Sequence, residues 1–212
     1  MATTGPRLVG EAADNSNARD QLIEAASQIM REGDTIDLSL SELSLRAGLN
    51  SALVKYYFGN KNGLMLALLD RDMGNIVHSL EALVAKDMPP QEKLQLHIGK
   101  VIDTYYAFPY LNRLLMRTVR DSAPVEAARI AELYLRPIAK SYDELISEGV
   151  KAGKFRKIDP QMFYFTVTGS ADRFYSSRLV MRHCYNQDDF NETMRDRYRE
   201  HTIDLIMRGI LV

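Results

Sequence analysis

The sequence predicts an all-α fold of about nine helices and no strands. Apolar residues recur at helical spacing from residue 18 onward, beginning with Leu22, Ile23, Ala26, Ile29 and Met30, which would form one face of an amphipathic helix. Alternating β-branched runs are few, and no Asn-Gly or Asp-Gly pair joins two of them as a hairpin turn would. Proline and glycine stand mainly where one helix would end and the next begin.

The composition is that of an ordinary globular protein. The chain has 212 residues, of which 46% are hydrophobic and 26% are charged, so it is neither a disordered chain nor a disulfide scaffold. Its longest apolar run, Leu64 to Leu69, is far shorter than the roughly 20 residues that cross a bilayer. Residues 1–20 lack the apolar core of a secretory signal, and the single Cys184 forms no internal disulfide. We therefore expect a cytoplasmic protein with no membrane partner.

The helix boundaries follow from local signals. Residues 1–17 are polar and without periodicity, and we expect them to form a mobile arm. The first helix would start at residue 18 and end at Gly33. Later breaks are expected at the following sites: Pro89 and Pro90, Pro109, Pro124, Gly149 to Pro160, and residues 186–189.

Two short helices are predicted between residues 39 and 58. Ser39 stands three residues before Glu42, the spacing of a capping box, so a helix would begin at Leu40. Ala47 and Gly48 would end it, because glycine adopts the left-handed conformation that closes a helix.

The second of these helices would be capped by Asn50, with Val54 and Phe58 facing inward. Two short helices joined by a tight turn and packed on a longer preceding helix form a helix-turn-helix. We expect residues 18–62 to form this DNA-binding domain and residues 63–212 to form a larger helical domain.

The outer face of the second short helix suits a DNA major groove. Ser51 and Ala52 are small, so the backbone can approach the base edges, while Lys55 and Tyr56 can reach phosphates. Lys61 would begin the next helix, where a cation opposes the helix dipole, and a phosphate partner would rationalise its position.

Overall charge does not support DNA binding. The net charge is −1, and residues 1–72 carry 7 Lys and Arg against 10 Asp and Glu. From residue 39 to 61, however, Glu42 stands against Arg46, Lys55 and Lys61, a local charge of +2. The prediction of DNA binding therefore rests on local placement.

Residues 39–64 resemble the amino-terminal module of the tetracycline-repressor (TetR) family of bacterial transcription regulators. The positions that match the family pattern in register are Leu43, Ala47, Gly48, Leu49, Asn50, Tyr57, Phe58, Lys61 and Leu64. The chain departs from the pattern at Asn50, where serine is common, at Lys55, where tyrosine is frequent, and at Tyr57, where histidine is frequent. These departures bear on the operator sequence that would be read. The length and helix count are also similar to those of the family.

The DNA-contacting residues are expected to come from the two short helices and the start of the next one. They are Ser39, Ser41, Asn50, Ser51, Ala52, Lys55, Tyr56, Tyr57 and Lys61. Tyr56 and Tyr57 have the alternative of being half-buried core aromatics, and Leu53 could contact a thymine methyl or pack beneath the helix.

The resemblance further implies an effector cavity and a dimer interface in residues 63–212. Candidates for the cavity wall are His97, Val101, Tyr105, Met116, Tyr134, Phe163, Val167 and Phe174, for each of which ordinary core packing is the alternative. The small residues of 162–173 suggest close helix packing, so Phe165, Gly169 and Arg173 are candidates for a two-fold interface with the helix of about residues 190–208. Packing within one chain is the alternative there.

These observations together predict a homodimeric, ligand-responsive transcription regulator, most readily a repressor that binds a pseudo-palindromic operator in double-stranded DNA. The effector would be small and largely apolar. A constitutive or architectural DNA-binding protein, or an all-α enzyme or interaction module, is the alternative. The chain contains no HxxxH pair, no CxxC, no GxGxxG and no GxSxG, so we expect no catalytic residues, no metal and no cofactor.

Overall fold

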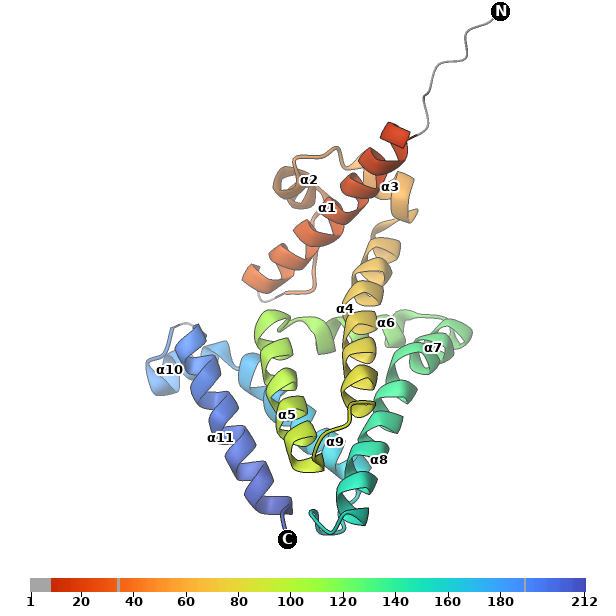
Figure 1. The fold of residues 1–212 in the computed structure, drawn as a ribbon. Helices are drawn as coiled ribbons and strands as arrows, with labels where there is room; N and C mark the ends of the chain where they lie inside the picture. Colours follow the sequence, from red (N-terminus) through yellow and green to blue (C-terminus); the bar gives the residue numbers. More distant parts are fainter. Residues whose placement is uncertain (1–8, 34, 189) are drawn as a thin grey trace, which may run out of the picture. The chain divides into compact units, whose positions relative to one another are not determined.

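A computed structural model of the chain describes residues 9–33, 35–188 and 190–212. These residues contain no strand, and their one β contact is an isolated bridge between Phe155 and Leu211. The all-α prediction is confirmed. The helices (Figure 1) are α1 (Val9–Gly33), α2 (Leu40–Ala47), α3 (Ala52–Phe58), α4 (Lys61–Val84), α5 (Pro90–Ala107), α6 (Leu111–Asp121), α7 (Pro124–Ile130), a π-helical turn η1 (Ala131–Leu135), α8 (Arg136–Lys151), α9 (Pro160–Tyr175), α10 (Arg178–Tyr185) and α11 (Glu192–Ile210).

The described residues contain one helix more than the nine expected, if the continuous run α7–η1–α8 is counted as a single helix. The additional boundary separates α9 from α10. There Ser176 Oγ donates to the carbonyl of Asp172 at 2.6 Å, and Ser177 Oγ donates to the carbonyl of Arg173. Serine side chains compete for helix carbonyls in this way, and no proline or glycine marks the position.

The start of α1 also differs from the expectation. The helix begins at Val9, so residues 9–17, which were expected to belong to a mobile arm of residues 1–17, are helical. Ala and Glu, which favour helix, occur at residues 11–13 and support this longer helix. Residues 1–8 of the expected arm lie outside the described residues.

The chain divides into two compact units, Met1–Arg71 and Asp72–Val212. In the smaller unit α1 packs against α2 and α3. The predicted inner face of α1 is buried throughout: Leu22, Ile23, Ala26, Ile29 and Met30 are each at most 3% exposed. The core of this unit also takes in Leu43, Val54, Leu64 and Leu68.

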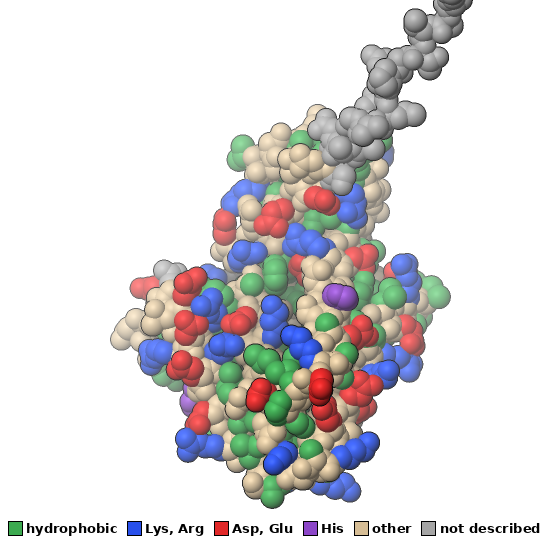
Figure 2. Space-filling view, viewed as in Figure 1, with side chains coloured by type: hydrophobic (Ala, Val, Ile, Leu, Met, Phe, Trp, Pro, Cys, Tyr) green, Lys and Arg blue, Asp and Glu red, His purple; other side chains and the backbone are tan. Residues whose placement is uncertain are grey.

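In the larger unit α5 is the central helix, and it packs against α8, α9 and α11. Lys93 of α5 is buried, and its Nζ donates to both carboxylate oxygens of Glu148 in α8 and to the carbonyl of Val84 at the end of α4. On the side facing α11, Gly99 leaves room for the guanidinium of Arg199, which an added Cβ would meet at 2.6 Å. On the face visible in Figure 2, acidic and basic side chains of this unit are interspersed.

None of the helices within the described ranges combines the length and the apolar character that a membrane span requires.

Candidate nucleic-acid interface and ligand cavity

The turn between α2 and α3 is built by local capping. Ser39 Oγ accepts from the backbone N–H of Glu42 at 3.5 Å, and Gly48 closes α2 at φ +64°. Leu43 is fully buried against α1. The predicted start and end of this helix, residues 40 and 47, are therefore confirmed, because each depends on a side chain or glycine at a defined offset.

α3 is held by Asn50 and Val54. Asn50 Oδ1 accepts from the backbone N–H of Ala52 at 2.8 Å, and Val54 is 2% exposed. Phe58 is half-buried, with the guanidinium of Arg19 over its ring at 5.4 Å. These inward contacts turn the opposite side of α3 to solvent.

Most of the residues predicted to contact DNA are exposed. Ser39, Ser41, Asn50, Ser51, Ala52, Lys55 and Tyr56 are exposed, whereas Tyr57 and Lys61 are half-buried. Tyr56 is 71% exposed and meets Tyr57 edge to face, with ring centroids 4.8 Å apart. The half-buried position of Tyr57 is compatible with the alternative that this ring belongs to the core.

The charge presented by residues 39–61 is lower than the +2 counted from the sequence, because Arg46 is paired with a carboxylate outside this segment. Arg46 Nη1 and Nη2 donate to the two carboxylate oxygens of Glu32 in α1 at 2.8 and 2.7 Å, and the hydrogen bond from Arg46 lowers the pKa of that carboxyl. Arg46 is thus neutralised locally. Lys55 makes no ion pair with any described residue, so it remains available to a phosphate.

Exposed apolar residues on α2 were not anticipated. Leu45 is 86% exposed and Leu40 is 40% exposed, on the helix that carries Ser41 and Glu42. Sequence periodicity identifies Leu43 as the buried residue of this short helix, but it assigns no contact to its other leucines.

The larger unit contains a partly open cavity of about 210 Å³. Its wall is formed by α4, α5, α6, α8 and α9, with Leu135 from the π-helical turn. A π turn inside a helix is uncommon and is often found at functional sites.

One part of the cavity wall carries tyrosines and a histidine. His97 and Tyr142 are both buried, meet edge to face at 4.7 Å, and their Nε2 and hydroxyl have no hydrogen-bond partner among the described residues. Burial lowers the pKa of His97 to about 4, so its imidazole is neutral at pH 7. Burial raises the pKa of the Tyr105, Tyr142 and Tyr164 hydroxyls, which stay protonated.

Three of the eight predicted cavity residues, His97, Val101 and Tyr105, lie in the wall. The other five do not. Met116 is 42% exposed; Tyr134, Phe163 and Val167 are buried in the core; and Phe174 stacks on Tyr198 with ring centroids 3.7 Å apart. All five lie on helices that border the cavity or continue into its wall, but none of the five lines it.

Sequence reasoning missed the contribution of α4. Seven residues of this helix lie in the wall: Asp72, Met73, Asn75, Ile76, Ser79, Leu80 and Leu83. Their helical spacing is equally typical of plain core packing. Asp72 is the one unusual member, because it is a buried carboxylate that accepts a hydrogen bond from the Tyr110 hydroxyl at 2.7 Å.

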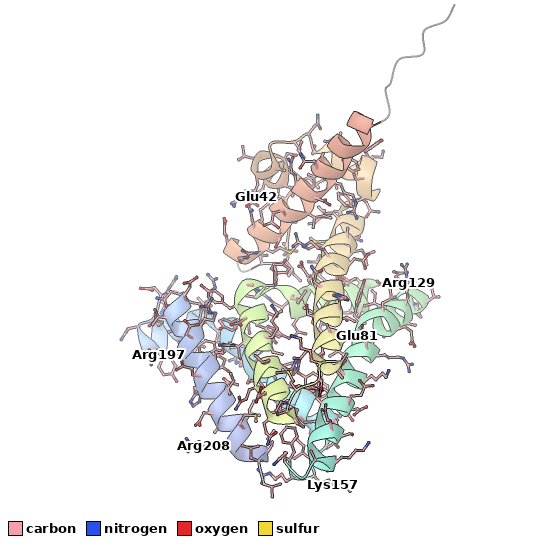
Figure 3. All side chains as sticks on the ribbon, viewed as in Figure 1. Glu42, Glu81, Arg129, Lys157, Arg197 and Arg208 are labelled. Atoms are coloured by element: carbon pink, nitrogen blue, oxygen red, sulfur yellow. The ribbon has the colours of Figure 1, made fainter. Side chains whose placement is uncertain are left out.

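A third surface lies on the outer side of α9. Phe165 and Met162 are 60% and 59% exposed, and Gly169 and Arg173 continue the same side of the helix. An added Cβ at Gly169 would meet no atom within 4 Å, so no close intramolecular approach requires this glycine. On α11, Leu205 is 64% exposed among charged residues such as Arg197 and Arg208, which project outward (Figure 3).

The described residues hold no group of three or more His, Cys, Asp or Glu side chains placed to bind a metal ion.

Two family profiles match the chain. Residues 22–68 match "Bacterial regulatory proteins, tetR family", and residues 87–212 match "Tetracyclin repressor-like, C-terminal domain". The second match alone spans more than half of the chain.

Curated relatives and solved structures agree with these profiles. The chain is 23% identical over 153 residues to the "Fatty acid metabolism regulator protein" of Bacillus subtilis, covering 72% of this chain and 78% of that protein. It is 24% identical over 174 residues to the "HTH-type transcriptional regulator RutR" of Escherichia coli, covering 82% and 79%.

Among solved structures, a regulator of the TetR/AcrR family from Thermobifida fusca has a TM-score of 0.68 at 21% identity, covering 91% of this chain and 98% of that one. FadR from Bacillus subtilis, solved in complex with stearoyl-CoA, has a TM-score of 0.64 at 20% identity, covering 90% and 98%. These similarities show that the fold is shared.

Proposed function

Since the chain belongs to the tetracycline-repressor family and is a DNA-binding transcription regulator, we propose that it is a ligand-responsive repressor that binds its operator as a homodimer. The observation that carries this proposal is the outer face of α3. Ser51, Ala52, Lys55 and Tyr56 are exposed together because Val54 is anchored inside. This combination of small, hydroxyl and cationic side chains suits a recognition helix in the major groove.

The DNA contacts we propose come from residues 39–61. Ser39 and Ser41 at the start of α2, Lys55 and Tyr56 on α3, and Lys61 at the start of α4 would contact phosphates, while Asn50, Ser51, Ala52 and Tyr57 would approach the groove. Two copies would place their α3 helices about 34–36 Å apart on successive turns of a pseudo-palindromic site.

The cavity of the larger unit is the proposed effector site. α4 begins directly after α3 and continues into the cavity wall, so a ligand that contacts α4 can favour one position of the recognition helix over another. The relative FadR, solved with stearoyl-CoA, supports an effector with apolar character. The cavity also favours this proposal over a constitutive DNA-binding protein, which needs no such space.

The outer side of α9 is the proposed dimer face, with Phe165, Gly169 and Arg173 facing α11 of the second copy as well as α9. Replacing Gly169 with Phe should convert the dimer to a monomer in light scattering, because the space above this glycine would be filled by the partner. Ala139→Phe, at an exposed position of α8, is the matched control. A Gly169→Phe protein that stays dimeric would contradict this assignment.

The homologues of this chain are transcription regulators, and we infer that it acts by binding without catalysis.

The central test is selection of random DNA duplexes by the purified protein, in parallel with Tyr56→Ala. We expect an enriched inverted repeat that the variant fails to recover. Enrichment of a single, non-repeated site would contradict the dimeric mode of binding. Failure to enrich any motif, by protein from which small molecules had been removed by denaturation and refolding, would contradict operator binding itself.

A further inference from the structure

We propose that the effector is an amphipathic monoanion, such as a medium-chain carboxylate, whose charged head pairs with Lys100 at the opening of the cavity while its apolar part lies inside. This inference rests on the proposed role of the cavity as the effector site, and it adds the chemistry of the ligand and the residue that would recognise its charge.

The opening of the cavity is polar. Of the residues that line the cavity, only Asn75 and Ser79 of α4 and Lys100 of α5 are exposed, and the others are buried or half-buried. A ligand that enters the cavity from solvent therefore passes these three side chains. Because they are exposed, a ligand can reach them without any rearrangement of the core.

The three side chains of the opening lie at similar levels along the two helices. α4 and α5 run in opposite directions (Figure 1), and Lys93 Nζ donates to the carbonyl of Val84 where their connected ends meet. At the rise of an α-helix, Lys100 lies about 10 Å along α5 from this contact, and Ser79 and Asn75 lie about 8 and 14 Å along α4. Neither Ser79 nor Asn75 has a side-chain hydrogen-bond partner among the described residues. Their hydroxyl and amide can donate to a carboxylate that Lys100 holds.

Lys100 is the cation that this opening offers. It forms no ion pair with any residue that the structure describes. Asp103, one turn further along α5, is instead directed to α11, where its carboxylate lies 3.9 Å from Nε of Arg195 and 3.6 Å from Nε of Arg199. Glu81 of α4 is exposed but does not line the cavity. The ammonium of Lys100 is therefore available to an anion from outside the chain.

The carboxylate of the wall, Asp72, is already engaged by the protein. It accepts from the Tyr110 hydroxyl at 2.7 Å, is 4% exposed and has a further interaction. By the same count along α4 it lies about 18 Å from the contact at Val84, which is about 8 Å beyond the level of Lys100. A cationic ligand would have to compete with Tyr110 for this carboxylate, whereas an anion at Lys100 displaces only water. The unpaired charge of the wall is positive, so the charge that complements it is negative.

The interior of the cavity suits the apolar part of such a ligand. α4, α6 and α8 contribute aliphatic side chains, including Ile76, Leu80, Leu115 and Ile138. Apolar walls with a few polar groups are the usual form of small-molecule sites, in which the polar groups fix the orientation. Because the cavity of about 210 Å³ is partly open, the head group of the ligand can remain in the opening while the apolar part is buried.

Three eight-carbon probes that differ in charge test the proposal. Octanoate, 1-octanol and octyltrimethylammonium are titrated separately into the full-length protein by calorimetry at low salt. We expect octanoate to bind about fivefold more tightly than octanol and the cation to bind more weakly than either, because an ion pair at an exposed site contributes modestly. Raising the salt concentration should reduce the advantage of octanoate, since salt screens exposed charges.

Variants then locate the charged contact. Lys100→Gln should reduce the affinity for octanoate to about that for octanol and leave octanol binding unchanged, and Lys100→Glu should make the cation the preferred probe. Lys86→Gln is the matched control, because Lys86 is an exposed lysine between α4 and α5 that does not line the cavity, and it should keep the preference for octanoate. Both lysines are at the surface, and thermal unfolding establishes that the variants are folded.

Several outcomes overturn the inference. Binding of octanol or of the cation as tightly as octanoate would refute a negative ligand charge, and absence of binding by all three probes would refute the amphipathic ligand altogether. A Lys100→Gln protein that still prefers octanoate would refute the assignment of Lys100. Operator binding is measured separately with DNA, so a protein that binds octanoate through Lys100 but enriches no DNA motif would contradict the proposed function and leave this inference standing.

Discussion

Tyr56 on α3 and Tyr142 in the cavity wall are the same residue type in opposite environments. Tyr56 is 71% exposed, and its contact within the smaller unit is the edge of the Tyr57 ring. Tyr142 is 2% exposed and is surrounded by the rings of His97, Phe163 and Tyr164. The hydroxyl of Tyr56 can be solvated, whereas that of Tyr142 is shut away from water without a partner.

The two tyrosines represent two kinds of proposed binding site, one on a solvent-exposed helix face and one in the wall of a cavity within the core. The outer face of α3 keeps its side chains in water, so changes there should leave folding alone and, in the proposed mode of binding, weaken the affinity for DNA. The wall of the cavity is part of the core, so changes there that alter packing or a buried ionisable group should alter the free energy of unfolding as well. The predictions below test this division, beginning with the scaffold that both kinds of site require.

The largest effect is expected at Gly63, which supports the outer face of α3. A Cβ at this position would overlap with the backbone carbonyl of Phe58, so the end of α3 or the start of α4 must shift. Gly63→Ala should lower the free energy of unfolding by about 3 kcal/mol or more and weaken DNA binding. Gly74→Ala in the same helix, where the added atom meets nothing within 4 Å, should be neutral or slightly stabilising. Equal stability of the two variants in denaturant unfolding would contradict this account.

The next effect concerns the cavity wall and its dependence on pH. His97 has its pKa lowered from 6.5 to about 4 by burial, so between these values the unfolded chain binds a proton that the folded chain does not. The free energy of unfolding should therefore fall as the pH is lowered through this window, by up to about 3 kcal/mol from this group. The contribution of His97 to the free energy of unfolding is fully retained above pH 6.5.

The contribution of His97 is isolated by comparing pH profiles. Denaturant unfolding of His97→Phe between pH 7 and 4 should show a shallower loss of stability than the unmodified protein. His201→Gln, at an exposed position of α11, should follow the unmodified profile. Parallel profiles for all three proteins would rule out a buried neutral His97.

A smaller effect, confined to binding, is expected at Lys55. Lys55→Ala should weaken binding to all duplexes by a similar factor and reduce the slope of log affinity against log salt by about one, because one phosphate contact is lost. Its unfolding should be unchanged. Lys157→Ala, at an exposed position outside the smaller unit (Figure 3), provides the control for charge alone. A salt slope equal to that of the unmodified protein would exclude Lys55 from the phosphate contacts.

The smallest effect on stability is expected for Tyr142→Phe. Its hydroxyl has no partner, so removing it deletes no hydrogen bond and relieves the desolvation of a polar group. Thermal unfolding should show a change within about 0.5 kcal/mol, neutral or stabilising. A clear loss of stability would mean that the hydroxyl is satisfied in solution.

The smaller unit was predicted well because its features depend on neighbours in sequence. Ser39, Gly48 and Asn50 act on backbone groups within four residues, and the buried side of α1 follows from a repeat of 3.6 residues. The charge of Arg46 was misjudged because its partner, Glu32, lies 14 residues away on another helix. The boundary between α9 and α10 was missed because it depends on two serine hydroxyls, a weaker signal than proline or glycine.

The sequence by itself determined the all-α class, the helix-turn-helix with its capping residues and outward face, and the resemblance that led to the family. Only the tertiary structure decided that α4 lines the cavity, that Phe163 and Val167 belong to the core, and that His97 and Tyr142 lack partners. Caps and amphipathic periodicity are local, so they can be recognised along the chain. A cavity is space left between five helices, and which apolar residues face it depends on how those helices pack rather than on any spacing within one of them.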